Sequence, residues 1–361
     1  MPSAPPARIK GRGAASNPEG RFESVRHHAE DDGWQRALLD EDAPRPRTQV
    51  SEERARSVIT RNDSPDIAFE QALNPYRGCE HGCIYCFARP SHSYLNLSPG
   101  LDFETKLRAK TNLAEILRAD LSKPSYVPKP INIGSNTDPY QPIEKNWRLT
   151  RAALELLLEC RHPCTIVTKN ALVERDLDLL APMAQQKLVQ VFVSVNSLDN
   201  RLASKLEPRA SAPHRRLQAI KTLSDAGVPT GVLVAPMIPA LNDRDMEAVL
   251  ERAAAAGANM AGYTVLRLPW ELKALFREWL AIHVPQRAEH VMSLVQQMNG
   301  GRDYDSDFRT RMRGQGPFAE LLRRRFEVAC RRHGFARSRS LALDTTRFEP
   351  PRKASPQGEL F

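Results

Sequence analysis

The sequence predicts an α/β fold, a partial parallel barrel of six strand–helix units, (βα)6, followed by appended helices. Short runs rich in β-branched and apolar residues, typical of buried parallel strands, alternate with amphipathic helical patterns. Six units are two fewer than a closed eight-unit barrel contains, so we expect the barrel to be open. The 361 residues, 41% of them hydrophobic, suffice for one large or two ordinary domains.

Four regions follow one another along the chain. Residues 1–60 mix proline, glycine, arginine and acidic residues without a hydrophobic period, so we expect a disordered arm. Residues 61–270 carry the barrel, residues 271–346 a helical region, and residues 347–361 a flexible tail that ends in QGELF. The expected strands are a segment just before the first cysteine and residues 130–134, 164–169, 189–195, 229–236 and 259–268. The expected helices are residues 105–121, 150–159, 174–186, 213–226, 243–256, 270–284, 287–299 and 317–333.

The order of strands also predicts where a site should lie. In a parallel barrel the reactive groups lie at the carboxyl ends of the strands. We therefore expect the loops that follow the six strands to meet at one cavity. These loops begin at Gly78, Gly134, Lys169, Val195, Ala235 and Arg267.

Composition favours a cytoplasmic protein without membrane contact. The first residues contain no apolar stretch of the kind that signal peptides have. The longest apolar stretch, residues 231–241, is interrupted by prolines and is shorter than the roughly 20 residues that a membrane-spanning helix needs. In the cytoplasm the six cysteines should stay reduced. The net charge of +9 favours contact with polyanions such as nucleic acids.

Three cysteines, Cys79, Cys83 and Cys86, lie within one short loop. A disulfide uses two sulfurs and a tetrahedral zinc site four ligands. Three thiolates at these spacings can bind three irons of a 4Fe-4S cluster, and the fourth iron then has no protein ligand. Two alternatives stay open, a zinc site completed by His81 or His92 and a cluster that is purely structural or carries electrons.

The other three cysteines are expected to be buried structural thiols. Cys160 and Cys164 flank the start of a strand, at the opposite end of the barrel from the cysteine loop. Cys330 lies in a C-terminal helical pattern, and free cysteine commonly packs as a small apolar side chain.

The cysteine loop resembles that of a known family. The arrangement Cys79-x3-Cys83-x2-Cys86, with Tyr85 before the last cysteine, is similar to the loop of the radical S-adenosylmethionine (SAM) superfamily. The segments NIGSNTDPYQPIE, TIVTKNALVERDLDLL and GVLVAPMIPALND resemble the spore photoproduct lyase branch, often labelled DNA-repair-photolyase-like. The resemblance implies a 4Fe-4S cluster whose free iron binds SAM, reductive cleavage to a 5′-deoxyadenosyl radical, and a flavodoxin or ferredoxin as electron donor.

The resemblance also suggests which residues contact SAM. Thr137 and Asp138 follow the second strand, where members of the superfamily bind the methionine amino group, and a carboxylate can accept from that cation. Ser194 and Asn196, at the end of the fourth strand, suit the ribose or the carboxylate. Lys169, after the third strand, can pair with the carboxylate.

One departure limits the choice of reaction. Spore photoproduct lyases carry a hydrogen-donating cysteine in the loop where this chain has Asn136. An amide cannot donate a hydrogen atom as a thiol does, so Tyr140 and Tyr263 are the candidates to replace it. RNA modification, DNA lesion reversal and peptide modification all remain open.

Three features favour a nucleic-acid substrate, and the first is the resemblance to the DNA-repair-photolyase-like branch. Residues 302–339 contain eleven arginines and five acidic residues. The last five residues resemble the peptide by which bacterial repair proteins bind the sliding clamp, with Gln357, Leu360 and Phe361 as contacts. The competing hypothesis is a non-catalytic iron–sulfur or zinc protein that binds nucleic acid.

Overall fold

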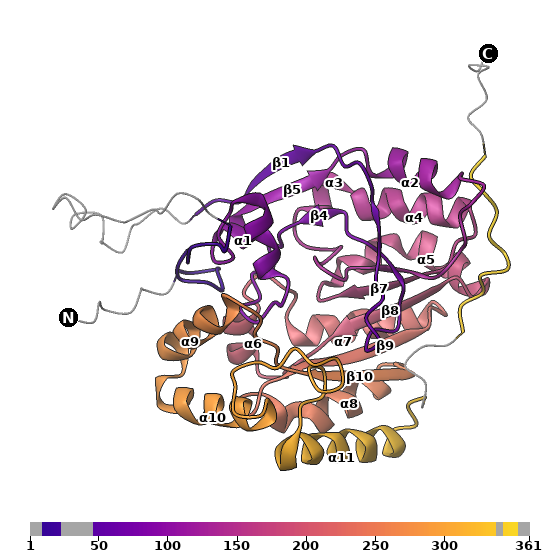
Figure 1. The fold of residues 1–361 in the computed structure, drawn as a ribbon. Coiled ribbons are helices and arrows are strands. Elements are labelled where there is room, and N and C mark those ends of the chain that lie inside the picture. The colour runs from indigo at the N-terminus through magenta and orange to yellow at the C-terminus, as the bar shows by residue number, and fades with distance from the viewer. Residues whose placement is uncertain (1–8, 23–45, 337–341, 353–361) are drawn as a thin grey trace.

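The computed structural model describes residues 9–22, 46–336 and 342–352. Its centre is a seven-stranded sheet in the order β10-β9-β8-β7-β6-β3-β2 (Figure 1), and all neighbours run parallel except β2 and β3. Its strands are β2 (Ile59–Arg61), β3 (Gln71–Leu73), β6 (Ile131–Ile133), β7 (Cys164–Thr168), β8 (Val189–Ser194), β9 (Thr230–Met237) and β10 (Met260–Val265). Within the described residues β2 and β10 each pair with one neighbour, so the sheet is open. The predicted partial barrel with six parallel strands is confirmed.

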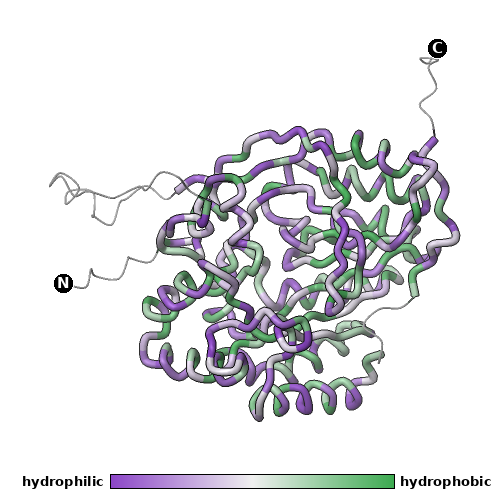
Figure 2. The backbone as a smooth tube through the Cα atoms, in the orientation of Figure 1, coloured by the Kyte–Doolittle hydropathy of each residue, from purple (hydrophilic) through white to green (hydrophobic). Residues whose placement is uncertain are grey.

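The two faces of this sheet differ in exposure. Ile166, Val191 and Val232 point to one face and are fully buried in the main core. Thr165 and Leu233 point to the other face and are partly exposed. The helices that contribute to the main core are α2 (Leu113–Leu121), α4 (Leu149–Glu159), α5 (Leu177–Gln185), α7 (Pro213–Asp225), α8 (Met246–Ala255) and α11 (Gly316–Arg332). Green and purple alternate along them in Figure 2, as amphipathic helices require. The inner face of the open barrel is therefore only partly accessible, because its side chains on β6 and β8 are buried.

The helices after the barrel include a support for the cysteine loop. Helices α9 (Leu272–His283) and α10 (Ala288–Met298) lie beside α6 (Asn200–Leu206) in Figure 1. Phe276 and Trp279 of α9 belong to one buried cluster with Ile84 and Tyr85 of the cysteine loop. The appended helices thus form part of the packing around Cys83 and Cys86.

A second, three-stranded sheet corrects two predictions. It has the order β1-β5-β4 and consists of β1 (Gln49–Glu53), β5 (Lys106–Lys110) and β4 (Tyr76–Arg77). The arm expected to be disordered thus contributes β1 and β2, and residues 9–22 are also placed against the barrel. The helix expected over 105–121 begins only at Leu113, because β5 pairs with strands on both sides. The short elements are η2 (Arg89–Leu95), α1 (Asp102–Thr105), α3 (Glu144–Trp147), η3 (Ala171–Asp176), η4 (Asp243–Asp245) and η5 (Pro285–Arg287).

Part of the tail expected to be flexible packs against the barrel. Phe348 lies 5.5 Å from the ring of Tyr126 and 5.3 Å from that of His162, and the amide of Glu349 donates to the carbonyl of Cys160 at 2.9 Å. The last five residues, QGELF, lie outside the described residues. None of the described helices combines the length and the apolar character that crossing a membrane would demand.

The packing around His162 predicts a pH dependence of stability. Burial lowers the pKa of His162 to about 4 from 6.5. A histidine whose pKa is lower in the folded than in the unfolded protein favours the fold fully only above its unfolded pKa. This contribution is lost as pH falls from about 6.5 to 4, because the unfolded chain then binds the proton more readily. Between pH 7 and 5 the free energy of unfolding should fall by about 2 kcal/mol less in His162→Gln than in the wild type. Urea unfolding at several pH values measures it. His290→Gln, at an exposed position, is the control; an unchanged pH dependence in His162→Gln would contradict the assignment.

Candidate active site

The three cysteines lie between β4 and η2, at the carboxyl end of the sheet. Cys79 and Cys83 are buried and Cys86 is partly buried. The loop turns twice, since the amide of Gly82 donates to the carbonyl of Cys79 at 3.3 Å and that of Cys86 to the carbonyl of Cys83 at 3.2 Å. Gly82 has a φ of +66°, which favours glycine over any residue with a side chain. The glycine between the cysteines therefore allows one short loop to present all three thiols.

The surroundings of the thiols suit ligands of a cluster. Burial raises the pKa of all three, because it disfavours the thiolate. The backbone amides of Asp138 near Cys79, and of Ala88 and Arg89 near Cys86, lower the pKa and so oppose this effect. Amide hydrogen bonds to sulfur also tune the potential of iron–sulfur clusters. Buried thiols with backbone amides nearby are thus in place, and metal binding would keep them deprotonated.

The two histidines of the zinc alternative have other partners. His81 Nδ1 lies 3.3 Å from the carboxylate of Asp138, and His92 Nε2 lies 2.9 Å from the carbonyl of Lys106. Within the described ranges no three His, Cys, Asp or Glu side chains are arranged to hold a single metal ion. In a cluster each thiolate binds a different iron, so the thiols need not converge on one point. The geometry favours a cluster over zinc.

Arg89 fixes the loop on one side. This side chain is fully buried, and all five of its N–H groups have acceptors. Nε donates to the carbonyl of Cys83 at 2.9 Å and Nη1 to the carbonyls of residues 99–100 at 3.1 and 2.8 Å. Nη2 donates to the carbonyl of Gly82 at 3.0 Å and to the carboxylate of Glu104, which is also fully buried. The backbone that leads into the second thiol is therefore held by one guanidinium.

Glu207 fixes the loop on a second side. Its carboxylate accepts hydrogen bonds from the hydroxyl of Tyr85 and from the guanidinium of Arg216. Arg216 is 1% exposed and also donates to the carbonyl of Ser194 at 3.0 Å. The residue next to Cys86 is thus tied to the carboxyl end of β8 through a buried ion pair.

Asp138 fixes the loop on a third side. Its carboxylate accepts from the hydroxyl of Thr168 at 2.7 Å, from the amide of Lys169 at 2.7 Å and from the amide of Tyr140 at 2.9 Å, in addition to the contact with His81. The pKa of Asp138 is lowered to about 2, because its hydrogen bonds and cationic neighbours outweigh burial. The carboxylate that was predicted to contact SAM thus joins the ends of β6 and β7 to the cysteine loop.

The remaining predicted residues lie close to this loop. The hydroxyl of Thr137 and the side-chain carbonyl of Asn196 are buried and have no hydrogen-bond partner in the structure. The amide group of Asn196 lies 3.3 Å from the hydroxyl of Tyr85, and Ser194 is also buried. Burial lowers the pKa of Lys169, but Cys83 and two carboxylates raise it more. Unsatisfied polar atoms beside the cysteines are what a bound polar ligand would satisfy.

The two tyrosines proposed as hydrogen-atom donors are not at this site. Tyr140 is fully buried, and its hydroxyl donates to Asp176 at 3.1 Å. Tyr263 is 2% exposed and packs against Phe326 of α11 at 4.7 Å. Both rings belong to the main core on the helix-covered face. Asn136 does lie at the strand end, and its amide group is 3.4 Å from the hydroxyl of Ser91.

The other three cysteines are free thiols outside the site. Cys160 and Cys164 are buried in the main core, and Cys330 of α11 packs partly against it. The strand β7 begins at Cys164, so this thiol lies at the amino end of the sheet. Their predicted structural role agrees with this placement.

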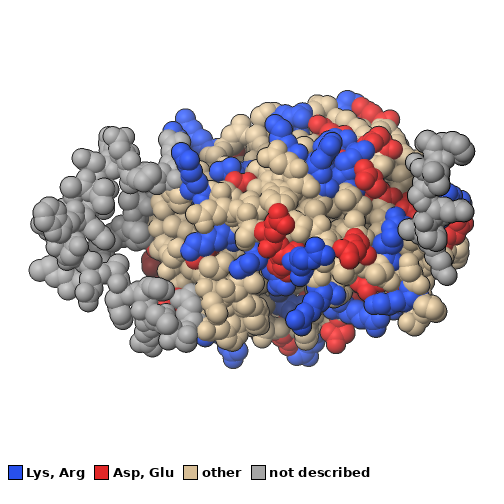
Figure 3. All heavy atoms as spheres, turned by 90° about the horizontal axis from the view of Figure 1, so that it is seen from above, with Lys and Arg blue, Asp and Glu red and all other residues tan. Residues whose placement is uncertain are grey.

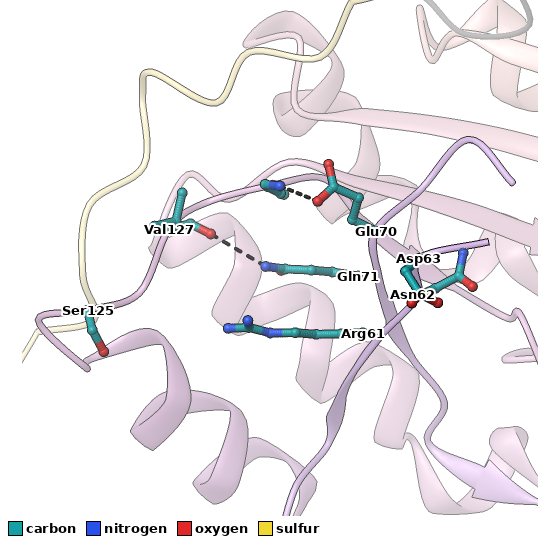
Figure 4. A pocket seen from close by; sticks show the side chains of 8 residues that line it. Arg61, Asn62, Asp63, Glu70, Gln71, Ser125 and Val127 are labelled. Carbon is teal, nitrogen blue, oxygen red and sulfur yellow. Dashed lines mark hydrogen bonds and ion pairs between the residues drawn. The ribbon is translucent and has the colours of Figure 1, made fainter. Parts of the chain in front are cut away.

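One pocket lies away from the cysteines. A cavity of about 660 Å³ opens at the amino end of β3, and Gln71 and the ion pair of Glu70 with Lys129 line it (Figure 4). The amide group of Gln71 donates to the carbonyl of Val127 at 3.4 Å. Parallel sheets place reactive groups at the opposite, carboxyl end, so we assign no chemistry to this pocket.

Comparison with known proteins decides the family. The profile of the Radical SAM superfamily matches residues 73–253, just over half of the chain. The chain belongs to the radical SAM superfamily. The match covers the cysteine loop and the strand ends described above, and it implies an enzyme that uses SAM and an iron–sulfur cluster. The family predicted from the cysteine spacing is confirmed.

Relatives of this radical SAM enzyme include proteins from bacteria and phages. An uncharacterized protein of Mycobacterium tuberculosis (strain ATCC 25618 / H37Rv) is 39% identical over 222 residues, which are 61% of this chain and 65% of the relative. The radical SAM Nalpha-GlyT isomerase of Pseudomonas phage M6 is 27% identical over 195 residues, which are 53% of this chain and 38% of the relative. The matches thus span less than two thirds of these relatives.

Solved structures confirm the fold. Spore photoproduct lyase complexed with dinucleoside spore photoproduct superimposes with a TM-score of 0.52 and 17% sequence identity, over 79% of this chain and 80% of the lyase. The open barrel of this radical SAM enzyme is therefore the lyase fold.

Proposed function

We propose that this radical SAM enzyme binds a 4Fe-4S cluster through Cys79, Cys83 and Cys86, and that its substrate is DNA. The cluster would bind SAM at its free iron and supply the electron for reductive cleavage. When bound, these groups would supply radical chemistry: one electron from a flavodoxin or ferredoxin would cleave SAM into methionine and a 5′-deoxyadenosyl group. That group would take a hydrogen atom from the substrate and be released as 5′-deoxyadenosine.

The chain's own residues bind and orient SAM in this proposal. The free hydroxyl of Thr137 and the fixed negative charge of Asp138 would receive the methionine amino group. The ammonium of Lys169 would pair with the carboxylate, and Ser194 and Asn196 would accept hydrogen bonds from the ribose. The single observation that carries the proposal is the set of three thiols in one buried loop beside unsatisfied polar atoms.

Anaerobic reconstitution tests the cluster and its chemistry. With iron and sulfide, then dithionite and SAM, we expect the wild-type chain to release 5′-deoxyadenosine and methionine, and Cys83→Ala to release neither. Cys330→Ala, which removes a thiol outside the site, serves as the control. An iron-loaded wild-type protein that releases neither product would favour the non-catalytic alternative. A colourless protein that binds zinc alone would contradict the cluster.

Several observations support DNA as the substrate. The net charge is +9. The Pseudomonas phage relative is named for an isomerisation of GlyT, and the lyase structure contains a dinucleoside. Phe87 directly follows Cys86, is 46% exposed, and stacks with Arg267 at 5.0 Å. The Nε of Arg267 is buried and has no hydrogen-bond partner, and its Nη1 lies 3.5 Å from the sulfur of Met312. An exposed ring beside an arginine whose Nε has no partner suits an unstacked base and its phosphate.

The arginine-rich helix α11 supports DNA binding less than its sequence suggested. Arg323 and Arg324 pair with Glu320 at 2.6 and 2.7 Å, and Arg325 pairs with Glu247 at 2.7 Å. On the face away from α11, which Figure 3 shows, basic and acidic residues are interspersed as well. The contact with Phe87 and Arg267 is therefore the better candidate.

Binding of single-stranded DNA tests this contact. We expect Phe87→Ala to weaken binding by about 1–3 kcal/mol, since it removes one stacking ring. Arg267→Gln should lower the slope of log affinity against log salt by about one. Fluorescence anisotropy of a labelled oligonucleotide measures both. Leu321→Ala, at an exposed position of α11, is the control; variants that bind like the control would place the DNA elsewhere.

Two partners stay predictions. We propose a flavodoxin or ferredoxin as the electron donor in the cytoplasm. We also propose that Gln357, Leu360 and Phe361 bind the sliding clamp, and deletion of residues 357–361 should abolish that association without loss of iron.

A further inference from the structure

The segment before the barrel, residues 9–22, contacts the cysteine loop directly. In Figure 1 it lies next to α1, which follows the loop. Arg12 is 7% exposed and Ala14 is 1% exposed. Ala14 belongs to the same buried cluster as Cys83, Ile84 and Tyr85. A segment without a hydrophobic period is thus buried where the thiols are presented.

Hydrogen bonds join this segment to the group that holds the loop. The amides of Gly13 and Ala14 donate to the two carboxylate oxygens of Glu104 at 2.9 and 2.8 Å. Arg12 donates to the carbonyl of Glu104 at 3.0 Å. Glu104 is the partner of Arg89, whose guanidinium holds the carbonyls at positions 82 and 83. The segment, Glu104, Arg89 and the cysteine loop therefore form one continuous network.

The backbones also touch. A Cβ atom on Gly13 would lie 1.8 Å from the carbonyl oxygen of Gly82, between the first two cysteines. A Cβ atom on Gly100 would lie 2.1 Å from the carbonyl oxygen of Ser16. Gly13 does not have the positive φ that favours glycine, so close approach alone requires glycine there. No side chain fits between the segment and the loop.

We propose that residues 9–18 are a wall of the cluster site, which fixes the cysteine loop and shields the cluster from oxygen and water. This inference rests on the proposed cluster. The strand ends reach the loop through Asp138 and Asn196, whereas this segment reaches it through Glu104 and Gly82. The wall therefore closes a side that the barrel itself leaves uncovered.

Gly13→Ala tests the wall in the full-length chain. The added methyl group must displace the segment, because the atom that it meets is backbone and cannot rotate away. Lys10→Ala, at an exposed position of the same segment, is the control. Hydrogen exchange of the metal-free proteins reports whether the loop over residues 79–86 opens. Loss of visible absorbance in air reports the lifetime of the reconstituted cluster.

We expect Gly13→Ala to speed the hydrogen exchange of the amides in the loop and to shorten the lifetime of the cluster in air. Each change should be at least about tenfold, because loss of one hydrogen bond to a charged group shifts an opening equilibrium by about that factor. Lys10→Ala should match the wild type in both measurements, and the strand amides of Gly13→Ala should exchange at the wild-type rate. A segment that detaches in Gly13→Ala while the loop stays protected would overturn the wall. Unchanged cluster lifetime would overturn the shielding. A wild-type chain without iron would contradict the proposed cluster, whereas the exchange result would still decide whether the segment holds the loop.

Discussion

Replacement of Arg89 by methionine is expected to lower the free energy of unfolding by about 3–5 kcal/mol, the cost of leaving one partner of a buried ion pair uncompensated. Glu104 would remain at 0% exposure without its cationic partner, and the carbonyls of Gly82 and Cys83 would lose their donors. Urea unfolding of the metal-free protein measures the loss. Because the backbone between the thiols would be released, we also expect little iron after reconstitution.

Arg77→Met is the matched control for this change. Arg77 lies just before the same loop and pairs with Glu53 at 2.9 Å, but its side chain is 48% exposed. Exposed ion pairs contribute less than about 1 kcal/mol, so Arg77→Met should remain close to the wild type. Arg89→Lys keeps the charge but has three donors in place of five, and we expect an intermediate loss. Equal effects of Arg89→Met and Arg77→Met would show that the buried network does not hold the loop.

The strands and helices whose apolar residues recur with a regular spacing were predicted from the sequence. Runs such as residues 189–195 and 229–236 became parallel strands because their β-branched side chains fill one face of the sheet. The prediction was wrong for residues 106–110, since the segment KLRAK was assigned to the following helix although it forms the strand β5. Pairing with β1 and β4, two segments distant in sequence, determines that strand.

The parts of the candidate site that were predicted are those whose residue type and spacing are typical of metal or cofactor binding. The three cysteines and the polar residues at the ends of β6, β7 and β8 do meet. Arg89 and Glu104 were missed, since a single sequence does not distinguish a buried charged pair from a solvated one. Residues 9–18 were missed because their contacts use backbone amides and the absence of side chains, which leave no periodic signal.

Replacement of Glu207 by glutamine should have an effect comparable to that of Arg89→Met. Arg216 would remain at 1% exposure without a carboxylate, which costs about 3–5 kcal/mol when a buried pair is broken. The hydroxyl of Tyr85 would also lose its charged acceptor, so the residue next to Cys86 could move. We expect lower stability of the metal-free protein in urea and a changed electron paramagnetic resonance signal of the reduced cluster.

Two further variants separate these effects. Glu174→Gln breaks the ion pair with Arg215, whose N–O distance is 3.0 Å and whose arginine is 45% exposed, and it should cost less than about 1 kcal/mol. Tyr85→Phe leaves the pair of Glu207 and Arg216 intact and removes one hydrogen bond to a charged group, about 1.5–3 kcal/mol. If Tyr85→Phe changes the resonance signal as Glu207→Gln does, the ion pair acts on the cluster through the position of Tyr85. If the signal changes in neither variant, the pair stabilises the barrel without orienting the cysteine loop.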